Sequence, residues 1–214
     1  MTQPNIREVR REASERAILD AALELFAAHG YEQTSIRKIA TKVGYSPGAI
    51  YSYFSSKEEI FLTLAEDGVR ALNEGDTANE PSDDALEDVR TTMWRIYEFS
   101  KEQPNMFALV FIERHVPMTR GYKRAFFGEI WGKVEGRIRR CVDNNIFPRS
   151  TDPYIALRLL SAGVFAIASH RISGRAPDGE DTDDLVRDSI EVAIAGLQSG
   201  VPIRSKAPEE HPFL

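Results

Sequence analysis

The chain has 214 residues, of which 42% are hydrophobic and 28% charged, and its formal net charge is −6. This length and composition are typical of a globular protein with a sizeable core, built as one large domain or two small ones. A single cysteine, Cys141, excludes an intramolecular disulfide framework, and four scattered histidines give no support to a zinc site. We therefore expect no metal and no cofactor.

The charge is unevenly distributed along the sequence. Residues 1–57 hold eight Lys and Arg against six Asp and Glu, a net +2, whereas residues 58–214 hold nineteen against twenty-seven, a net −8. An acidic protein repels phosphate except where a basic segment faces it. Any contact with nucleic acid is therefore expected in the N-terminal segment.

Nothing in the sequence predicts export or membrane insertion. Charged residues follow one another from Arg7 onward, and the longest uncharged apolar run covers only residues 162–168. A signal peptide needs an uninterrupted apolar core, and a membrane-spanning helix needs about 20 apolar residues. We expect a cytoplasmic protein with no membrane partner.

The N-terminal part predicts a series of short helices. Apolar residues recur at helical spacing over 14–30, where Ser14 can cap the start, and a short helix follows over 34–43. Ser46 and the following proline, a capping serine with proline at the first helical position, predict a third helix. A capping box that begins at Ser56 predicts a fourth helix, over 56–72.

The rest of the chain predicts a larger helical domain. Residues 73–84 are acidic and poor in apolar side chains, as expected of a connection. A helical pattern begins at Leu86 and ends near Pro104, others follow over 105–115, 126–142, 154–172 and 182–198, and no strand-like alternation of useful length is present. The predicted fold class is all-α, with a three-helix helix-turn-helix domain before a larger helical ligand-binding and dimerisation domain. The predicted boundaries are 1–57 for the first domain, 58–74 for a connecting helix, 84–199 for the second domain and 200–214 for an irregular tail.

The segment 34–57 has the pattern of a helix-turn-helix. Gly44 lies where the chain must reverse between two short helices. The inward face is expected to consist of Ile36, Ile39, Ala40, Val43, Ile50 and Phe54. The outward face is then left to Ser46, Pro47, Gly48, Ala49, Tyr51, Ser52 and Tyr53. Small residues at the front of a recognition helix let its backbone approach base edges, and hydroxyl groups can bond phosphate oxygens.

The stretch TSIRKIATKVGYSPGAIYSYFSSKEEIF, with Tyr51, Phe54 and Lys57 in a three-residue spacing, resembles the DNA-binding domain of the TetR/AcrR family of transcriptional regulators. With the preceding helix the close resemblance covers residues 14–64. It implies phosphate contacts from Ser35, Tyr51, Tyr53 and Lys57. It also implies positions close to the bases for Arg37, Pro47, Gly48, Ala49 and Ser52.

The sequence departs from the family pattern at Ala49, where Thr or Ser is common. A methyl group can only pack or contact a thymine methyl, so Arg37 and the shape of the DNA are expected to carry more of the sequence recognition. Ahead of the motif, arginines alternate with glutamates from Arg7 to Arg16. These arginines either lie on a solvated helical extension or reach a phosphate or the minor groove.

Large aromatic and methionine side chains are concentrated over residues 93–131. They either fill an ordinary helical core or line an adaptable apolar cavity. The candidate ligand-binding residues are Met93, Trp94, Tyr97, Met106, Phe107, Phe111, Phe127 and Trp131.

The last two predicted helices carry more apolar surface than one small domain hides, so a two-fold four-helix interface between subunits is expected, the alternative being a monomer. The candidate interface residues are Leu159, Ala162, Gly163, Ala166, Leu185, Ile190, Ala193, Ile194 and Leu197.

These features predict a homodimer that binds a double-stranded, pseudo-palindromic DNA operator. The resemblance favours a repressor released by a small, largely apolar ligand, with an activator or a ligand-independent DNA-binding protein as the alternatives. An enzyme is not expected, because the sequence shows no nucleophile with its base, no metal cluster and no glycine-rich phosphate loop.

Overall fold

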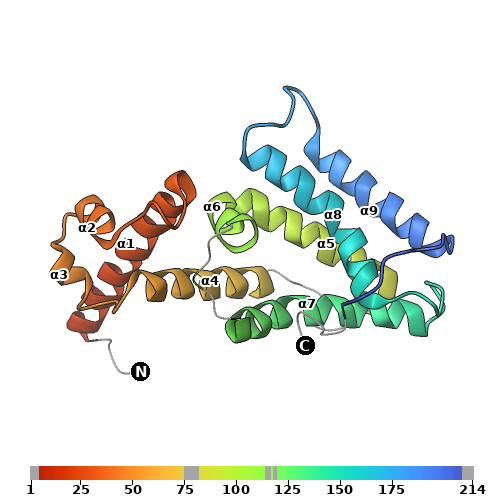
Figure 1. Ribbon diagram of the computed structural model, residues 1–214, viewed down its shortest axis with the longest axis horizontal. Coiled ribbons are helices and arrows are strands. Elements are labelled where there is room, and N and C mark those ends of the chain that lie inside the picture. Colours follow the sequence, from red (N-terminus) through yellow and green to blue (C-terminus); the bar gives the residue numbers. More distant parts are fainter. Residues whose placement is uncertain (1–4, 75–81, 114–116, 118–119, 209–214) are drawn as a thin grey trace. The chain divides into compact units, whose positions relative to one another are not determined.

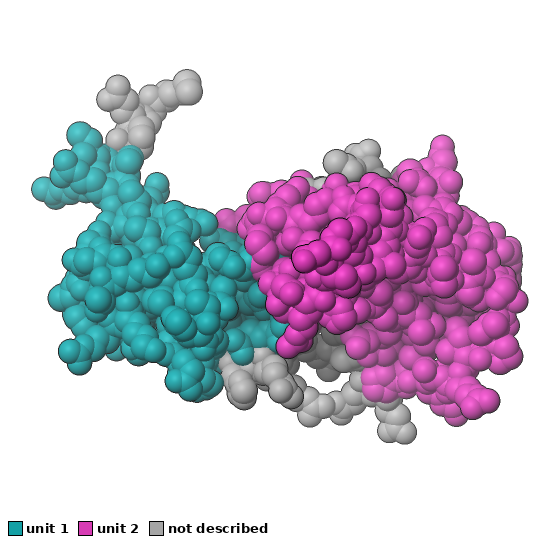
Figure 2. All heavy atoms as spheres, turned by 90° about the horizontal axis from the view of Figure 1, so that it is seen from above, with its two compact units in different colours: residues 1–68, 105–118 teal, residues 69–104, 119–214 magenta. Residues whose placement is uncertain are grey.

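The computed structural model describes residues 5–74, 82–113, 117 and 120–208, and for residues 120–126, 129 and 130 it describes the backbone alone. Every regular element within these ranges is helical (Figure 1), so the predicted all-α fold class is confirmed. The chain divides into two compact units (Figure 2). Unit 1 comprises Met1–Gly68 and Asn105–Met118, and unit 2 comprises Val69–Pro104 and Thr119–Leu214.

Unit 1 is built around the N-terminal helices. Their bounds are Ile6–His29 for α1, Ile36–Val43 for α2, Pro47–Ile50 for α3 and Lys57–Glu74 for α4, of which the part up to Gly68 belongs to this unit. The core of the unit contains the fully buried Ile18, Ile39, Ile50 and Phe61. Burial of such apolar side chains is the main contribution that holds short helices together.

The first helix is longer than the sequence analysis predicts. It begins at Ile6 and not near Ser14, because the Asn5 side chain accepts a hydrogen bond from Arg7 N at 3.1 Å and caps the start. Arg11 and Glu15, four residues apart on this helix, form an ion pair with 2.8 Å between Nε and Oε1. The alternating charges that begin near Arg7 therefore lie on an exposed helical extension.

A second segment from far along the chain joins unit 1. It consists of α6 (Pro104–Phe107) and a π-helical turn, η2 (Ala108–Ile112). A Cβ atom at Gly68 would lie 2.8 Å from Met106 Cγ, so only glycine lets α4 approach this segment so closely. Glu113 Oε2 also accepts a hydrogen bond from Tyr31 N, at 3.1 Å. The helix-turn-helix and this segment therefore belong to one packed unit.

Unit 2 contains α5 (Ala85–Glu102), α7 (Arg120–Asp143), α8 (Pro153–Ile172) and α9 (Thr182–Gln198). The α8 helix packs against the other three, and Ala156, Leu160 and Val164 on it are buried. Its length and composition would also suit a membrane span, but 44% of that window is buried within the fold. It is a core helix. Within the predicted connection, residues 75–81 lie outside the described residues.

The packing of α9 on α8 corrects part of the predicted subunit interface. Ile190, Ile194 and Leu197 are at most 4% exposed and face the interior of unit 2. A Cβ atom at Gly163 would lie 2.7 Å from Ser189 Cβ, so this glycine serves close contact between α8 and α9 of the same chain. The sequence predicts these four residues at the subunit interface because spacing alone does not show which apolar face of a helix packs within its own chain. In the structure, that face of α8 and α9 is covered by the same chain.

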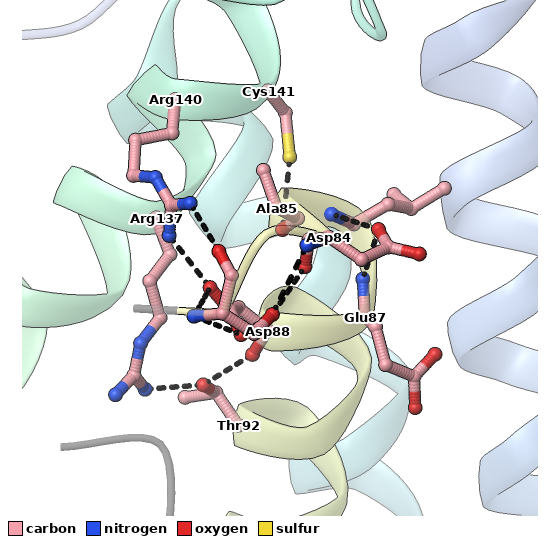
Figure 3. Close-up of polar contacts among 10 residues, drawn as sticks. Asp84, Ala85, Glu87, Asp88, Thr92, Arg137, Arg140 and Cys141 are labelled. Atoms are coloured by element: carbon pink, nitrogen blue, oxygen red, sulfur yellow. Dashed lines mark hydrogen bonds and ion pairs between the residues drawn. The ribbon is translucent and has the colours of Figure 1, made fainter. Parts of the chain in front are cut away.

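A buried polar network joins α5 to α7 in unit 2 (Figure 3). The Asp88 carboxylate is 3% exposed and accepts hydrogen bonds from Ser82 Oγ and from Arg140, each at 2.6 Å. Burial by itself would raise the pKa of Asp88, but the hydrogen bonds from Ser82 and Arg140 outweigh it and lower that pKa. Beside it, Cys141 Sγ donates to Ala85 O, and burial raises the pKa of this thiol to about 11.

Replacing Asp88 by Asn should lower the free energy of unfolding of unit 2 by about 2–3 kcal/mol at neutral pH, because charge-assisted hydrogen bonds in a buried site are lost. Since folding lowers the pKa of Asp88, its contribution is complete above the unfolded value, about 3.9, and is lost as the pH falls through the folded value. Urea unfolding across the acid range measures this. The exposed Asp143→Asn variant is the control. Equal effects of the two substitutions would contradict the role of the network.

Candidate nucleic-acid interface

The two helices of the motif are held by serine caps. Ser35 Oγ accepts a hydrogen bond from Lys38 N at 3.3 Å, and Ser46 Oγ accepts one from Ala49 N at 3.1 Å. Gly44 between them has φ 74° and ψ 24°, a left-handed conformation that favours glycine. Because each capping oxygen acts as an acceptor, its hydroxyl proton can still donate to a phosphate oxygen.

The structure places nearly all the predicted DNA-contacting residues on one connected stretch of unit 1, and most of them are open to solvent. The exposed ones are Ser35, Arg37, Ser46, Pro47, Gly48, Tyr51 and Ser52, and the half-buried ones are Ala49, Tyr53 and Lys57. The regular part of α3 is only Pro47–Ile50, and the chain continues as a turn through residues 51–53. The recognition element, which consists of α3 and the turn through residue 53, is therefore short. Its backbone is accessible at Pro47 and Gly48.

The aromatic residues of the motif differ in their surroundings. Tyr51 is 56% exposed, which suits an outward contact. Tyr53 stacks on Tyr45 with ring centroids 6.4 Å apart, and the Arg11 guanidinium lies 5.8 Å from the Tyr53 centroid. Tyr45 Oη donates to Ser14 Oγ at 3.1 Å. The extension of α1 is thus connected to the recognition element through tyrosine side chains, which sequence reasoning missed because residues 11 and 53 are so far apart.

The cations of α2 are not equally available to a ligand. Lys38 Nζ donates to Gln33 O at 2.7 Å, and Lys42 Nζ pairs with Glu24 at 2.7 Å. The Arg37 guanidinium is exposed, and no hydrogen bond or ion pair occupies it among the described residues. Of the cations on this helix, Arg37 is therefore the one best able to reach DNA.

Lys57 has an internal role that the sequence did not predict. Its Nζ donates hydrogen bonds to Tyr31 O at 2.9 Å and Thr34 O at 3.0 Å, and it lies 3.9 Å from the centroid of the Tyr31 ring. The contact joins the first residue of α4 to the loop between α1 and α2. Burial and the nearby Glu58 carboxylate raise the pKa of Tyr31, which therefore stays neutral. The predicted phosphate contact of Lys57 remains a prediction beside this structural role.

The predicted ligand-binding residues are divided between the two units. Met106, Phe107 and Phe111 belong to unit 1, and the other five belong to unit 2. Met93, Tyr97, Met106 and Phe107 are at most 3% exposed and act as packing. Tyr97 Oη also lies 2.8 Å from Thr182 Oγ1 and 2.9 Å from Asp183 Oδ1, a contact that fixes α5 to α9.

The remaining members of that set also have local partners. Trp131 packs edge-on against Phe165, with centroids 5.8 Å apart, and Phe127 is half-buried. Trp94 lies in an open groove under the Arg187 guanidinium, whose Cζ is 4.3 Å from the centroid of the Trp94 ring. A ligand-binding role for members of this aromatic set stays a prediction. In the part of the chain that the structure describes, no His, Cys, Asp and Glu cluster could hold a metal ion.

Comparison with known proteins identifies the motif. Residues 18–64 match the model for bacterial regulatory proteins of the tetR family. The HTH-type transcriptional repressor AcnR of Corynebacterium diphtheriae is 50% identical over 54 residues, which cover 25% of this chain and 28% of that relative. The HTH-type transcriptional regulator AcrR of Shigella flexneri is 27% identical over 216 residues, covering 95% of this chain and 99% of that one. The chain belongs to the TetR family of transcription regulators, whose members are not enzymes.

The fold of the whole chain agrees with this assignment. The structure of FadR from Bacillus subtilis in complex with stearoyl-CoA has a TM-score of 0.68 at 19% identity, with 85% of this chain and 98% of that chain covered. At this identity the likeness concerns the fold. The strong sequence match to AcnR spans less than a third of that relative, so similarity is concentrated in the DNA-binding motif.

Replacing Lys57 by Met should lower the free energy of unfolding of unit 1 by about 2 kcal/mol, because two carbonyl groups lose a charged donor. Lys42→Met is the matched control, since its exposed ion pair with Glu24 contributes at most about 1 kcal/mol. Urea unfolding followed by circular dichroism measures both. If Lys57→Met were as mild as Lys42→Met, the internal role of Lys57 would be wrong.

Proposed function

We propose that this TetR-family chain is a homodimeric, sequence-specific DNA-binding regulator that represses transcription and is released from its operator by a small ligand bound in unit 2. The observation that carries the proposal is the exposed surface of the helix-turn-helix, with its two capping serines, accessible recognition backbone and unoccupied Arg37 guanidinium. A cytoplasmic protein with a pseudo-palindromic operator fits this function.

Phosphate contacts in the proposed complex come from hydroxyl groups and the N-termini of helices. Ser35 and Tyr51 are exposed and carry no charge, and they suit positioning on the phosphate backbone. Tyr53 is held by Tyr45 and Arg11, so it offers a fixed hydroxyl. Such contacts set the register of the protein on DNA without selecting a sequence.

Base recognition in the proposed complex depends on few side chains. Ser52 Oγ donates to Ala49 O at 2.7 Å, so its proton is used within the recognition element, and the Ala49 methyl group forms no hydrogen bond. Arg37 is the remaining long donor, and Arg is the side chain most often used to read guanine. We infer that Arg37 and DNA shape supply most of the sequence preference.

A second subunit would cover an apolar face of α8 and α9. The exposed residues on these helices are Leu159, Ala162, Ala166, Leu185 and Val192, of which Val192 is 73% exposed. Three of them are large apolar side chains, and the two alanines would allow close approach of helices from two subunits. The proposed interface therefore leaves out Gly163, Ile190, Ile194 and Leu197, which α8 and α9 of the same chain cover. It keeps the exposed members of the sequence-based prediction, which are Leu159, Ala162, Ala166 and Leu185. Ala193 is half-buried at its edge.

Ligand control requires two states that differ in the spacing of the recognition helices, about 34–36 Å or somewhat more when bound to successive major grooves. The sequence suggests α4 as the only connection between the two parts of the chain. Residues 105–113 form a second connection, because they pack on α4 and α1 within unit 1. Repression is favoured because AcnR is named a repressor, and activation is the alternative.

Replacing Arg37 by Ala should weaken binding to the operator by about tenfold or more while reducing binding to random DNA much less, because a base contact is lost. Arg175→Ala, an exposed arginine of unit 2, removes the same charge elsewhere and is the control. Fluorescence anisotropy with duplexes from the region upstream of the gene measures both. Equal losses on operator and random DNA would contradict the assignment of Arg37 as a reader.

Replacing Val192 by Asp should raise the dimer dissociation constant by about a hundredfold, because an unpaired charge would be buried at the interface. Val201→Asp, at a valine that is 60% exposed in the C-terminal segment, is the control. Sedimentation velocity gives the oligomeric state. If Val192→Asp remained dimeric at the concentrations where the parent chain is dimeric, this face would not be the interface.

A further inference from the structure

The first two turns of α1 (Figure 1) are exposed on all sides. Residues 5–13 are open to solvent without exception, and the apolar Ile6 and Val9 are 71% and 47% exposed. The start of the helix therefore depends on the Asn5 cap and not on packing. Helices in proteins are stabilised mainly by burying one face. A helical extension that buries no face within its own chain is a candidate contact with a partner.

Two arginines on this extension have no partner. The side chains of Arg7 and Arg10 form no hydrogen bond or ion pair with any residue that the structure describes. The sequence explains this, because no acidic residue lies three or four positions before or after either of them. Arg11 and Arg16 differ, since each pairs with an acidic residue four positions later, at 2.8 and 2.9 Å. The two free cations are therefore a consequence of spacing and not of one side-chain conformation.

Both free arginines lie on the face of α1 that contacts the recognition element and the turn before it. The Arg11 guanidinium lies 5.8 Å from the centroid of the Tyr53 ring. Ser14 Oγ accepts a hydrogen bond from the Tyr45 hydroxyl at 3.1 Å. The two free arginines precede Arg11 and Ser14, respectively, by four residues. Each therefore lies one helical turn, about 6 Å, further along the same face.

The acidic residues of the extension lie on a different face. Residues 6–15 hold three arginines and three glutamates, so the segment is neutral in composition. At 3.6 residues per turn, Glu8 and Glu12 are centred about 150° around the helix axis from Arg7 and Arg10. Charges that alternate along the sequence are thus separated in space. One face of the extension is positive, and it borders the recognition element.

This arrangement is unfavourable for the protein on its own. Arg7 lies in the first turn of α1, where the positive end of the helix dipole disfavours a cation. Arg10 and Arg11 follow it by three and four residues, and like charges at these spacings repel each other. An anion against this face would offset both effects. In the proposed complex, the phosphates of the bound DNA are the anions closest to it.

We propose that the extension of α1 is a second DNA-contacting surface, on which Arg7 and Arg10 bind backbone phosphates next to the site of the recognition element. The inference rests on the proposed function, because it requires DNA on the helix-turn-helix. An α-helix is about 10–12 Å wide and the minor groove about 6 Å, so the extension lies along the backbone and does not enter that groove. Arg11, which is paired with Glu15 and lies over Tyr53, positions the extension.

Fluorescence anisotropy of the full chain with operator and random duplexes, over a series of salt concentrations, tests the proposal. Arg7→Gln and Arg10→Gln should each weaken binding of the dimer to both duplexes by the same factor, about tenfold or more at low salt, because phosphate contacts carry no sequence information. Each should also lower the slope of log affinity against log salt by about one unit per bound subunit.

Arg16→Gln is the matched control. It removes the same charge from the same helix, but from a side chain that pairs with Asp20 and lies 3.5 Å from Asp67. This variant should change affinity by at most about twofold and leave the salt slope unchanged. Thermal unfolding verifies that every variant is folded, and sedimentation velocity gives its oligomeric state.

Equal effects of Arg16→Gln and Arg10→Gln would show that overall charge and not contact is responsible, and would overturn the proposal. Losses on operator DNA alone would indicate base reading and overturn the assignment to phosphates. Unchanged DNA affinity with an altered oligomeric state would make the extension a subunit contact and also overturn it. A parent chain that binds no specific DNA would contradict the proposed function and this inference with it. Specific binding by the parent chain that Arg7→Gln and Arg10→Gln leave unchanged would overturn this inference alone.

Discussion

The DNA-binding part of the molecule depends on the contact of one ammonium group with two backbone carbonyls. Lys57 Nζ binds Tyr31 O and Thr34 O, so the start of α4 is tied to the loop that enters α2. Tyr31 N in turn donates to Glu113 beyond η2, which brings the later segment into the same packing unit. Lys57 and Glu113 therefore connect α4 and residues 105–113 to the loop that supports the motif.

Polar contacts between helices also fix the packing of unit 2. Asp88 joins α5 to α7 through Arg140, and Tyr97 joins α5 to α9 through Asp183.

Much of the fold could be predicted from the sequence, because helical periodicity and capping residues are local signals. The turn at Gly44, the caps at Ser35 and Ser46 and the buried Ile39 and Ile50 follow from spacing alone. Contacts between distant residues could not be predicted in this way. Spacing does not reveal that Lys57 reaches Tyr31 O or that Ile190 faces inward. An aromatic-rich sequence also suggested a cavity where rings such as Tyr97 mainly fill the core.

In the proposed complex, two copies of this chain place their short recognition elements in successive major grooves of one operator. A DNase I footprint on the DNA flanking the gene tests this most directly. We expect protection of two symmetric half-sites whose centres are about one helical turn apart or slightly more. Protection of a single half-site at every saturating concentration, or of no specific site, would contradict it.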